Sequence, residues 1–345
     1  MLTEKQVKEI RLHLEKAQNP LFFFDNDPDG LCSFLILQRY IGRGKGIPIK
    51  SFPELMPEYF RKIRELNADY VFILDKPLVS VGFFEEINKI NIPVVWIDHH
   101  VTDNLIPDFV NYYNPTLNKK RTSEPVTALC YQISKKKEDL WISIIGSVSD
   151  GFIPENYKEF EKKYPDLSMK SKNALEIFYR TDVGKMARMM SFGLKDRTTN
   201  VINMIRFLIK AKNPYEFLHA DLKNSFQKRF HQIDSKYQHL LKKAVALGKK
   251  QRKIIFFQYG GDLSMSSDIA NELTYLFNNR NIAVVYIKGS KANISFRGNK
   301  IRTGFLKSIE GLEGATGGGH ENAVGGQIKI EDIEKFRENL EKNLN

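Results

Sequence analysis

The sequence is poor in cysteine. Its 345 residues include only Cys32 and Cys130, which lie far apart in the chain. No Cys-x-x-Cys pair is present, so the common cysteine-based zinc motifs and dithiol redox motifs are excluded. We expect both cysteines to be core residues in a reducing compartment.

Long apolar runs are also missing. No stretch approaches the roughly 20 apolar residues that a membrane-spanning helix needs, and the first residues carry mixed charge instead of the apolar segment of a signal peptide. We therefore expect no membrane association and a cytoplasmic location. The chain has 42% hydrophobic and 12% aromatic residues, which suffices for real cores, and its length favours about two domains.

Glycine is not arranged as in a phosphate-binding loop. Residues 42–46 contain three glycines, but they lack the order of residues that such a loop requires. We interpret this segment as a connecting loop, with contact to a substrate as the less favoured alternative.

Acidic side chains follow the first strongly apolar run. Residues 21–24 are expected to form a short buried strand, and a helical pattern begins at Leu31. Between them lie Asp25, Asp27 and Asp29, on alternate positions of a strand-to-helix turn, where open α/β sheets bind ligands. Three acids there repel one another, so a divalent cation is the natural compensation. The alternative is an acidic solvated turn or a helix N-cap.

Three further apolar runs of strand length end in side chains that bind metals. The runs at 68–74, 92–97 and 140–149 are followed by Asp75, by Asp98, His99 and His100, and by Asp150. Each aspartate alone is explained by the end of a strand or helix. Together they place carboxylates and imidazoles from four elements at one edge of a sheet, which a purely structural role does not easily explain.

The elements around these runs predict an α/β fold. Residues 3–17 repeat apolar positions at helical spacing behind a capping Thr3. Residues 61–66 and 81–87 precede strands as crossover helices, which predicts parallel βαβ units. Residues 126–133 predict an apolar helix whose N-terminus is a candidate anion site.

Most of the positive charge lies in one segment. Residues 195–253 contain fifteen Lys and Arg against four Asp and Glu, an excess of +11 in a chain whose net charge is +12. Apolar residues recur there at three- and four-residue steps, which predicts one long helix. These residues are Leu222, Phe226, Phe230, Ile233, Tyr237, Leu240, Ala244 and Leu247. Such a helix is roughly 40 Å long, enough to tie two domains across a cleft.

Basic residues of this helix lie off its apolar seam. They are Lys228, Arg229, Lys236, Lys242 and Lys243. They form either a solvated helix surface or an electrostatic guide for a polyanion, and the sequence leaves both readings open.

A second, smaller α/β unit begins at about residue 252. Strands are expected at 253–257, 282–287 and 292–296, and a helix is expected at 266–277. Ser295 and Arg297 then point to one face of a strand, as a phosphate-binding pair requires, although a surface arginine at a strand end is the alternative.

A glycine-rich turn follows at 314–320. Gly317, Gly318, Gly319 and His320 would let the backbone approach a ligand closely and leave amide donors uncovered. Taken alone, the segment is equally well explained as a hairpin loop.

These residues resemble the DHH phosphoesterase family, which is named for the Asp-His-His triplet seen here at 98–100. Residues 25–30 are similar to the first motif of the family in its RecJ-type form, Asp75 to the second and Asp150 to the fourth. Residues 294–297 and 317–320 resemble the DHH-associated domain of the nuclease branch. The order and spacing of these motifs agree over nearly the whole chain.

The resemblance implies a centre of two divalent ions that share one bridging carboxylate. The bridge would be Asp75, with Asp25, Asp27 and Asp29 on one side and with His99 and Asp150 on the other. Oxygen-dominated ligation with one imidazole suits Mn²⁺ or Mg²⁺ better than zinc.

The resemblance also implies roles for the remaining motif residues. His100 would contact a substrate phosphate or orient a neighbour, and Asp98 would support a histidine. Together with His100, the substrate-binding residues would be Ser295, Arg297, Gly317, Gly318, Gly319 and His320.

The expected protein is thus a RecJ-like exonuclease that hydrolyses single-stranded DNA or RNA. Asp25 stands where the pyrophosphatase branch has histidine, which favours the nuclease branch. A nanoRNase-type hydrolase of short oligonucleotides or cyclic dinucleotides is the main alternative. A silent relative that acts as a replication scaffold is disfavoured, because all motif carboxylates are present.

The expected organisation has three parts. A DHH domain would cover residues 1–190, a basic helical connector residues 191–250 and a substrate-binding domain residues 251–345, with a cleft between the two domains that admits a strand terminus. No OB-fold or zinc module is evident in the remaining length to show how a strand is held.

Overall fold

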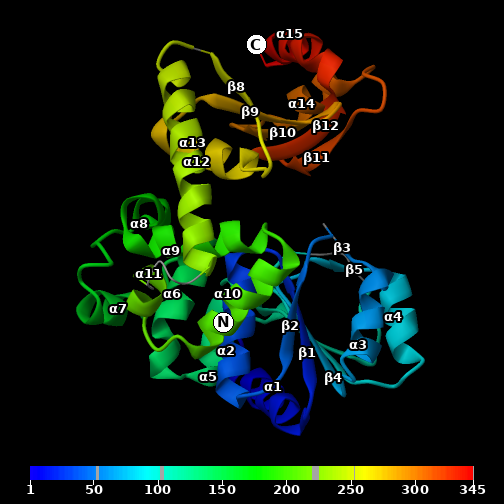
Figure 1. The fold of residues 1–345 in the computed structure, drawn as a ribbon. Helices are drawn as coiled ribbons and strands as arrows, with labels where there is room; N and C mark the ends of the chain where they lie inside the picture. Colours follow the sequence, from blue (N-terminus) through cyan, green and yellow to red (C-terminus); the bar gives the residue numbers. More distant parts are fainter. Residues whose placement is uncertain (52–53, 102–104, 220–224, 252, 345) are drawn as a thin grey trace. The chain divides into compact units, whose positions relative to one another are not determined.

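A computed structural model describes residues 1–51, 54–101, 105–219, 225–251 and 253–344 (Figure 1). The chain divides into two compact units, Met1–Lys228 and Arg229–Asn345. Most of the segment expected to be a connector therefore belongs to the first unit. The part from Arg229 onward belongs to the second.

A five-stranded parallel sheet forms the centre of the first unit. Its strand order is β2-β1-β4-β6-β7, a doubly wound pattern in which β1 lies beside β4. The strands are β1 (Pro20–Asp25), β2 (Lys45–Ile49), β4 (Tyr70–Leu74), β6 (Val94–Ile97) and β7 (Val110–Tyr113). A separate two-stranded sheet pairs β3 (Glu54–Leu55) with β5 (Leu78–Val79). The three strands expected at 21–24, 68–74 and 92–97 are confirmed.

Strand β2 corrects the interpretation of residues 42–46 as a loop at Lys45 and Gly46, whereas residues 42–44 lie outside helices and strands as expected. Pro48 hides the strand, since proline is tolerated only at a sheet edge, and β2 is an edge strand. Gly46 also lacks any strand preference, but a Cβ atom there would come within 2.6 Å of the Phe34 ring. The glycine is therefore required by the packing of a helix against the edge of the sheet.

Aromatic residues of β1 alternate between the two faces of the sheet. Phe22 and Phe24 pack on Phe34, with ring centroids 5.5 and 5.2 Å away. Phe23 instead packs edge-on against Phe83, at 5.7 Å. Helix α2 (Pro28–Ile41) carries Phe34, and α4 (Val81–Asn88) carries Phe83. Both faces of the central strand are thus buried, as expected for a parallel sheet.

Further helices complete the first unit. Thr3 caps α1 through a capping box with Gln6. The helices are α1 (Glu4–Lys16), α3 (Arg61–Glu65), α5 (Val126–Ser134), α6 (Leu140–Ser149), α7 (Tyr157–Lys163), α8 (Ala174–Arg180), α9 (Asp182–Leu194), α10 (Thr198–Lys210) and α11 (Pro214–Leu218).

The run at 140–149 forms helix α6, not the expected strand. Every residue from Leu140 to Val148 is buried, and α6 packs against α2, α5 and α9. A helix that is apolar on all sides has no amphipathic period, so its pattern cannot be told from that of a buried strand.

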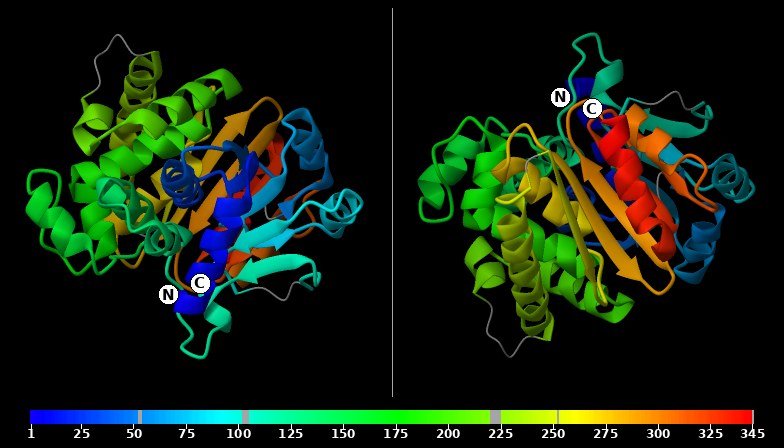
Figure 2. Two further views of the ribbon diagram at one scale, coloured as in Figure 1. Left: turned by 90° about the horizontal axis from the view of Figure 1, so that it is seen from below. Right: turned by 90° about the horizontal axis from the view of Figure 1, so that it is seen from above.

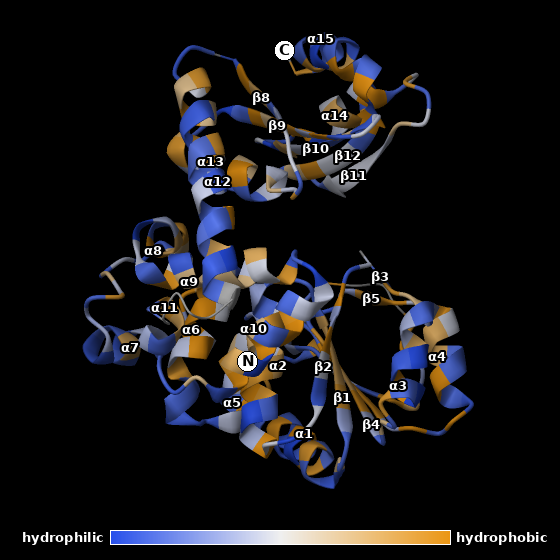
Figure 3. Cartoon of the chain, in the orientation of Figure 1, coloured by the Kyte–Doolittle hydropathy of each residue, from blue (hydrophilic) through white to orange (hydrophobic). Residues whose placement is uncertain are grey.

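The long helix α12 (Ser225–Gly248) is confirmed, although Leu222 and the side chain of Phe226 lie outside the described residues. Phe230, Ile233, Tyr237 and Ala244 are buried as expected. Between Tyr237 and Ala244 the buried residue is Leu241, whereas the expected Leu240 and Leu247 are only partly buried. Figure 3 shows that polar and apolar residues mix along α12. No described helix is long and apolar enough to cross a membrane.

The second unit is a mixed five-stranded sheet of order β11-β12-β10-β9-β8. Only β8 and β9 pair in parallel. Its strands are β8 (Ile254–Gly260), β9 (Asn281–Lys288), β10 (Lys291–Arg297), β11 (Thr316–His320) and β12 (Ala323–Lys329). Helix α13 (Ser266–Leu276) packs on β9 and β10. Helices α14 (Arg302–Ile309) and α15 (Ile333–Asn343) share a core with the sheet, and Figure 2 shows α15 lying along the strands.

The glycine-rich segment at 314–320 is a strand, not the expected turn. Residues Thr316 to His320 form the edge strand β11, which is exposed along its whole length. Glycine has low strand propensity, so the sequence gives no sign of this pairing. A Cβ atom at Gly317 would come within 2.8 Å of Phe305, so close packing of α14 under the edge requires a glycine there.

Candidate metal centre and substrate pocket

Parallel strands bring most of the predicted site residues to one edge of the first sheet. Asp25 ends β1, Asp75 directly follows β4, and His99 and His100 follow β6. Because these strands are neighbours and run in parallel, their carboxyl ends meet. Asp150 does not follow a strand; it is the C-cap residue of helix α6.

Asp27 and Asp29 both cap helices. The Asp27 carboxylate accepts a hydrogen bond from the Gly30 amide (2.9 Å), so Asp27 is the N-cap of α2, and its role as a metal ligand stays a prediction. The Asp29 carboxylate accepts from the backbone amides of Val126 (2.9 Å) and Thr127 (2.8 Å) at the start of α5. The predicted anion site at this helix N-terminus is therefore taken by a carboxylate of the chain itself.

Asp75 has an unusual backbone. Its φ of 57° lies in the left-handed region, and its side chain is 4% exposed. Its amide donates to the carbonyl of Ile97 (3.0 Å), which ties the turn after β4 to β6. A buried carboxylate on a strained turn indicates a position held for function.

His99 is the side chain that joins the acids. Its Nε2 atom lies 3.4 Å from Oδ1 of Asp75 and 3.9 Å from Oδ2 of Asp150. Its Nδ1 atom lies 3.5 Å from the carbonyl oxygen of Ser123, a distance that suits a weak hydrogen bond orienting the ring.

Two groups of side chains among the described residues have the spacing of a metal site. One consists of Asp75, His99 and His100, and the other of Asp29, His99 and Asp150. Within each group the ligand atoms lie within 4.8 Å of one another. Over the two groups the donors are three carboxylates and two imidazoles. The group of Asp29, His99 and Asp150, with two carboxylates and one imidazole, has the oxygen-rich set that suits Mn²⁺ or Mg²⁺.

Asp98 supports His100. One oxygen of the fully buried Asp98 lies 2.8 Å from Nδ1 of His100, and the other accepts from the His100 amide (3.1 Å). Tyr112 donates to the same second oxygen (3.4 Å). A carboxylate that fixes an imidazole in this way sets its tautomer and direction, which is the role expected for Asp98.

The acids at this edge of the sheet raise one another's pKa values. Burial, followed by the charges of neighbouring carboxylates, raises the pKa of Asp27 to about 8 and holds the pKa of Asp75 well above its ordinary value. Burial and the charge of Asp29 raise the pKa of Asp150 to about 6. Burial alone would lower the pKa of His100, but its hydrogen bond to Asp98 and the nearby acids raise it. A divalent cation would relieve this repulsion.

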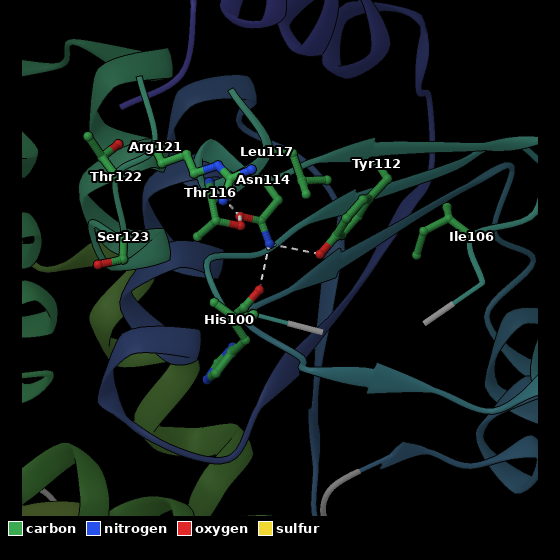
Figure 4. A pocket seen from close by; sticks show the side chains of 10 residues that line it. His100, Ile106, Tyr112, Asn114, Thr116, Leu117, Arg121, Thr122 and Ser123 are labelled. Carbon is green, nitrogen blue, oxygen red and sulfur yellow. Dashed lines mark hydrogen bonds between the residues drawn. The ribbon is translucent and has the colours of Figure 1, made fainter. Parts of the chain in front are cut away.

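A pocket of about 460 Å³ opens beside His100 (Figure 4). Asn114 donates both to the His100 carbonyl and to the Tyr112 hydroxyl, each at 2.8 Å. Leu117 and Arg121 also line the pocket. Sequence reasoning missed this pocket. The basic run that ends in Arg121, between the histidines and helix α5, is the one signal that indicates it.

The predicted phosphate-binding pair of the second unit has partners within the chain. Ser295 lies 2.9 Å from the Ser266 hydroxyl. Arg297 donates from Nε to Asn271 (2.7 Å) and from Nη1 to the carbonyls of Phe296 (3.0 Å) and Val324 (3.3 Å).

The glycine-rich segment lies in the same sheet as this pair but is not adjacent to it. Gly317, Gly318, Gly319 and His320 belong to β11, and β12 separates that strand from β10 with its Ser295 and Arg297.

Comparisons with known proteins agree with this architecture. Residues 21–149 match the DHH family, N-terminal domain, and residues 250–345 match the DHHA1 domain. Together the two ranges cover about two thirds of the chain. No curated protein sequence is significantly similar.

Several solved structures share the fold. The exonuclease RecJ bound to manganese is 14% identical, with a TM-score of 0.67 over 99% of this chain and 94% of that one. RecJ from Thermus thermophilus in complex with Mn²⁺ is 14% identical, with a TM-score of 0.66 over 98% of this chain and 54% of that one, so the chain spans about half its length. PggH from Vibrio cholerae, a pGpG-specific phosphodiesterase, is 15% identical, with a TM-score of 0.54 over 95% and 99%.

Proposed function

Because the chain belongs to the DHH family of phosphoesterases, we propose that it is a metal-dependent, RecJ-like exonuclease that hydrolyses single-stranded DNA or RNA. The observation that carries this proposal is the pair of metal-spaced side-chain groups that share His99. Asp75, a buried acid with a raised pKa at the edge of the sheet where ligands bind, marks a functional site.

The side chains present fit a divalent metal. The group of Asp29, His99 and Asp150 would hold one ion, and the neighbouring Asp75 would be shared with a second ion. His100 would instead contact a substrate phosphate, because a protonated imidazole cannot bind a metal. Ions of this kind lower the pKa of water and neutralise charge on phosphoryl oxygens. We propose Mn²⁺ or Mg²⁺ and two ions per chain.

The chain's own residues prepare this edge for a phosphodiester. Asp98 holds the His100 ring, and His100 also borders the pocket, so this histidine lies where a phosphate group would pass from the acids to the pocket. Protonated His100 would donate to a phosphate oxygen, and its raised pKa favours the protonated form.

The size and lining of the pocket support the proposal that a nucleotide binds there, next to that phosphate. Its volume of about 460 Å³ suits one nucleoside, and the Tyr112 ring and Leu117 offer apolar contact to a base or sugar. Arg121 would pair with a neighbouring phosphate.

We assign the second unit to substrate binding as well. Arg297, Ser295 and the exposed edge strand with Gly317, Gly318, Gly319 and His320 would hold the part of the substrate that the metal centre does not reach. The bonds of Arg297 fix its guanidinium at the end of β10, which pre-organises a phosphate contact.

Short oligonucleotides or cyclic dinucleotides are the alternative substrates. A pocket that accepts one nucleoside is compatible with both. The pGpG-specific phosphodiesterase shares the fold and has nearly the length of this chain, which supports this alternative.

The deciding experiment is Mn²⁺-dependent digestion of DNA and RNA strands labelled at either end, with dinucleotides and a cyclic dinucleotide in the same series. Stepwise shortening of long strands from one end supports the exonuclease. Rapid cleavage of dinucleotides without attack on long strands selects the alternative. No hydrolysis of any phosphodiester with Mn²⁺ or Mg²⁺ would refute both.

A further inference from the structure

One lysine is buried among the acids of the metal centre. Lys76 directly follows Asp75 and is fully buried, and no other lysine is buried among the residues whose burial the structure describes. Its ammonium nitrogen lies 2.6 Å from Oδ1 of Asp25 and 2.7 Å from the carbonyl oxygen of Ser51. An ammonium removed from water needs such charged and polar partners.

Backbone geometry places this lysine. The left-handed conformation of Asp75 turns the chain sharply after β4. The indole nitrogen of Trp96 then donates to the carbonyl of Lys76 (3.0 Å), so both the backbone and the ammonium of Lys76 are held. The lysine is thus fixed between β1 and β6 by the fold and is not a mobile surface group.

Asp25 is correspondingly absent from the metal-spaced groups. Neither group found among the described residues includes it, although it ends the strand next to Asp75. One of its oxygens is bonded to a cation that the chain itself supplies. A lysine ammonium and a divalent ion compete for the same carboxylate lone pairs.

We propose that Lys76 serves as a built-in cation of this centre, holding Asp25 in place of a metal ion. Asp25 is then a positioning residue, not a metal ligand. Metal ions are confined to the groups around His99. This inference rests on the proposed metal centre, but it does not depend on which substrate is hydrolysed.

The test is a titration of the full chain with Mn²⁺. Binding is measured by calorimetry and by the electron paramagnetic resonance signal of free Mn²⁺. Four proteins are compared: the unmodified chain, Asp25→Asn, Lys76→Met and the double variant. Asp25→Asn should keep the number of bound ions and change their affinities by less than about threefold. Lys76→Met should add an ion or tighten the weakest one by about tenfold or more, because Asp25 is released as a ligand.

Thermal melting without metal supplies the second readout. Asp25→Asn should melt lower, because it leaves the Lys76 ammonium buried without its carboxylate. Lys76→Met should melt lower as well, and the double variant should recover much of the loss. This non-additivity is the mark of a direct pair. If Asp25→Asn does not fold, the double variant carries the Mn²⁺ test alone.

Two results would overturn the proposal. One is a tenfold or greater loss of Mn²⁺ affinity in both Asp25→Asn and the double variant, which would make Asp25 a ligand. The other is additive melting shifts, which would show that Lys76 and Asp25 do not interact. Both readouts are independent of hydrolysis, so an inactive protein that shows the expected binding pattern refutes only the proposed exonuclease.

Discussion

The two sheets present their polar residues in opposite ways. At the edge of the first sheet, Asp29 and Asp75 are almost fully buried, and burial, followed by repulsion from the neighbouring carboxylates, raises the pKa of Asp75. In the second sheet, the edge strand β11 is exposed, and Arg297 is bonded to an amide side chain and to backbone carbonyls.

We infer from this difference that the first edge carries the catalytic chemistry and that the second unit holds the substrate. Buried like charges are costly unless a cation compensates them, which is why we propose that the first edge binds an ion. An exposed glycine strand costs little when nothing is bound, which suits contacts that form and break in each cycle. Changes at the first edge should therefore abolish activity, and changes in the second unit should weaken it.

The largest effect is expected from Asp75→Asn. Asparagine keeps the side-chain volume and tolerates the left-handed φ of 57°, so only the charge and one ligand oxygen are lost. Hydrolysis should fall by on the order of a thousandfold or more, because metal-based charge stabilisation is worth several kcal/mol. Calorimetry should show that tight Mn²⁺ binding is lost.

The exposed Asp108→Asn is the matched control, since it removes the same charge from a turn outside the site. Unaltered Mn²⁺ binding in Asp75→Asn would contradict the assignment of Asp75 as a ligand.

A smaller effect is expected from Arg297→Lys in the second unit. The charge is kept, but the planar guanidinium is lost, and one charged hydrogen bond is worth about 1.5 to 3 kcal/mol. Catalytic efficiency should fall roughly ten- to a hundredfold, while Mn²⁺ binding stays intact. Steady-state kinetics and Mn²⁺ calorimetry on one preparation measure both.

Asn271→Ala tests whether the partners of Arg297 serve the fold or the substrate. It removes the side chain that accepts from Nε of Arg297 (2.7 Å) but leaves the guanidinium in place. If Arg297 is only structural, both variants should lower the melting temperature with little kinetic change. Full activity in Arg297→Lys would refute a substrate role for Arg297.

The sequence predicted the first sheet well because its strands are flanked by clear signals. Apolar runs of strand length ended in acids at β1, β4 and β6, and each of these strands is present. The prediction of a strand at 140–149 was wrong, because complete burial of helix α6 removes the helical period of its apolar residues. Strands β2 and β11 were missed because proline and glycine, which disfavour strands, are tolerated at their edge positions.

The site was predicted less completely than the fold. The order of the motifs indicated Asp75, His99 and Asp150, which the structure brings together. The sequence could not show that Asp29 caps helix α5, because that contact joins residues almost a hundred positions apart. Lys76 gave no signal either, since a single lysine after a strand is usually solvated and only the tertiary fold buries it.

A third prediction uses pH to examine the buried acids. The folded pKa of Asp27 is about 8, against an ordinary value of 3.8, so between these values the folded protein binds the proton more tightly than the unfolded one. This contribution to stability is complete near pH 4 and is lost as pH rises toward 8. The metal-free melting temperature should therefore fall with rising pH, on the order of 5 °C between pH 5 and 8.

Melting curves in a chelator at several pH values check this slope. Asp27→Asn should flatten it, and the exposed Asp108→Asn should not. Mn²⁺ added at pH 8 should raise the melting temperature again, because it compensates the ionised acids. A slope that is unchanged in Asp27→Asn would show that this carboxyl group does not titrate as inferred.

The smallest effect is expected from substitutions on helix α12, because its lysines would attract a long strand only through their exposed charge. Lys228, Lys242 and Lys243 are exposed, whereas Arg229 and Lys236 lie 3.9 and 3.0 Å from Asp262. Changing the three exposed lysines to glutamine should weaken long single strands about three- to tenfold and leave dinucleotides almost unaffected. If all three lysines contact phosphates, the slope of log affinity against log salt should become shallower by about 2, at roughly 0.7 per contact.

The control replaces three exposed lysines on other helices of the second unit, Lys307, Lys335 and Lys342, so that the net charge of the two proteins is equal. Because net charge acts over the whole molecule while phosphate contacts are local, only the α12 variant should change the salt slope. Equal losses in both variants, or equal losses for long strands and dinucleotides, would mean that the charge of α12 is a solvated surface. The binding of long strands would then depend on the pocket beside His100 and on the contacts proposed for Arg297 and β11.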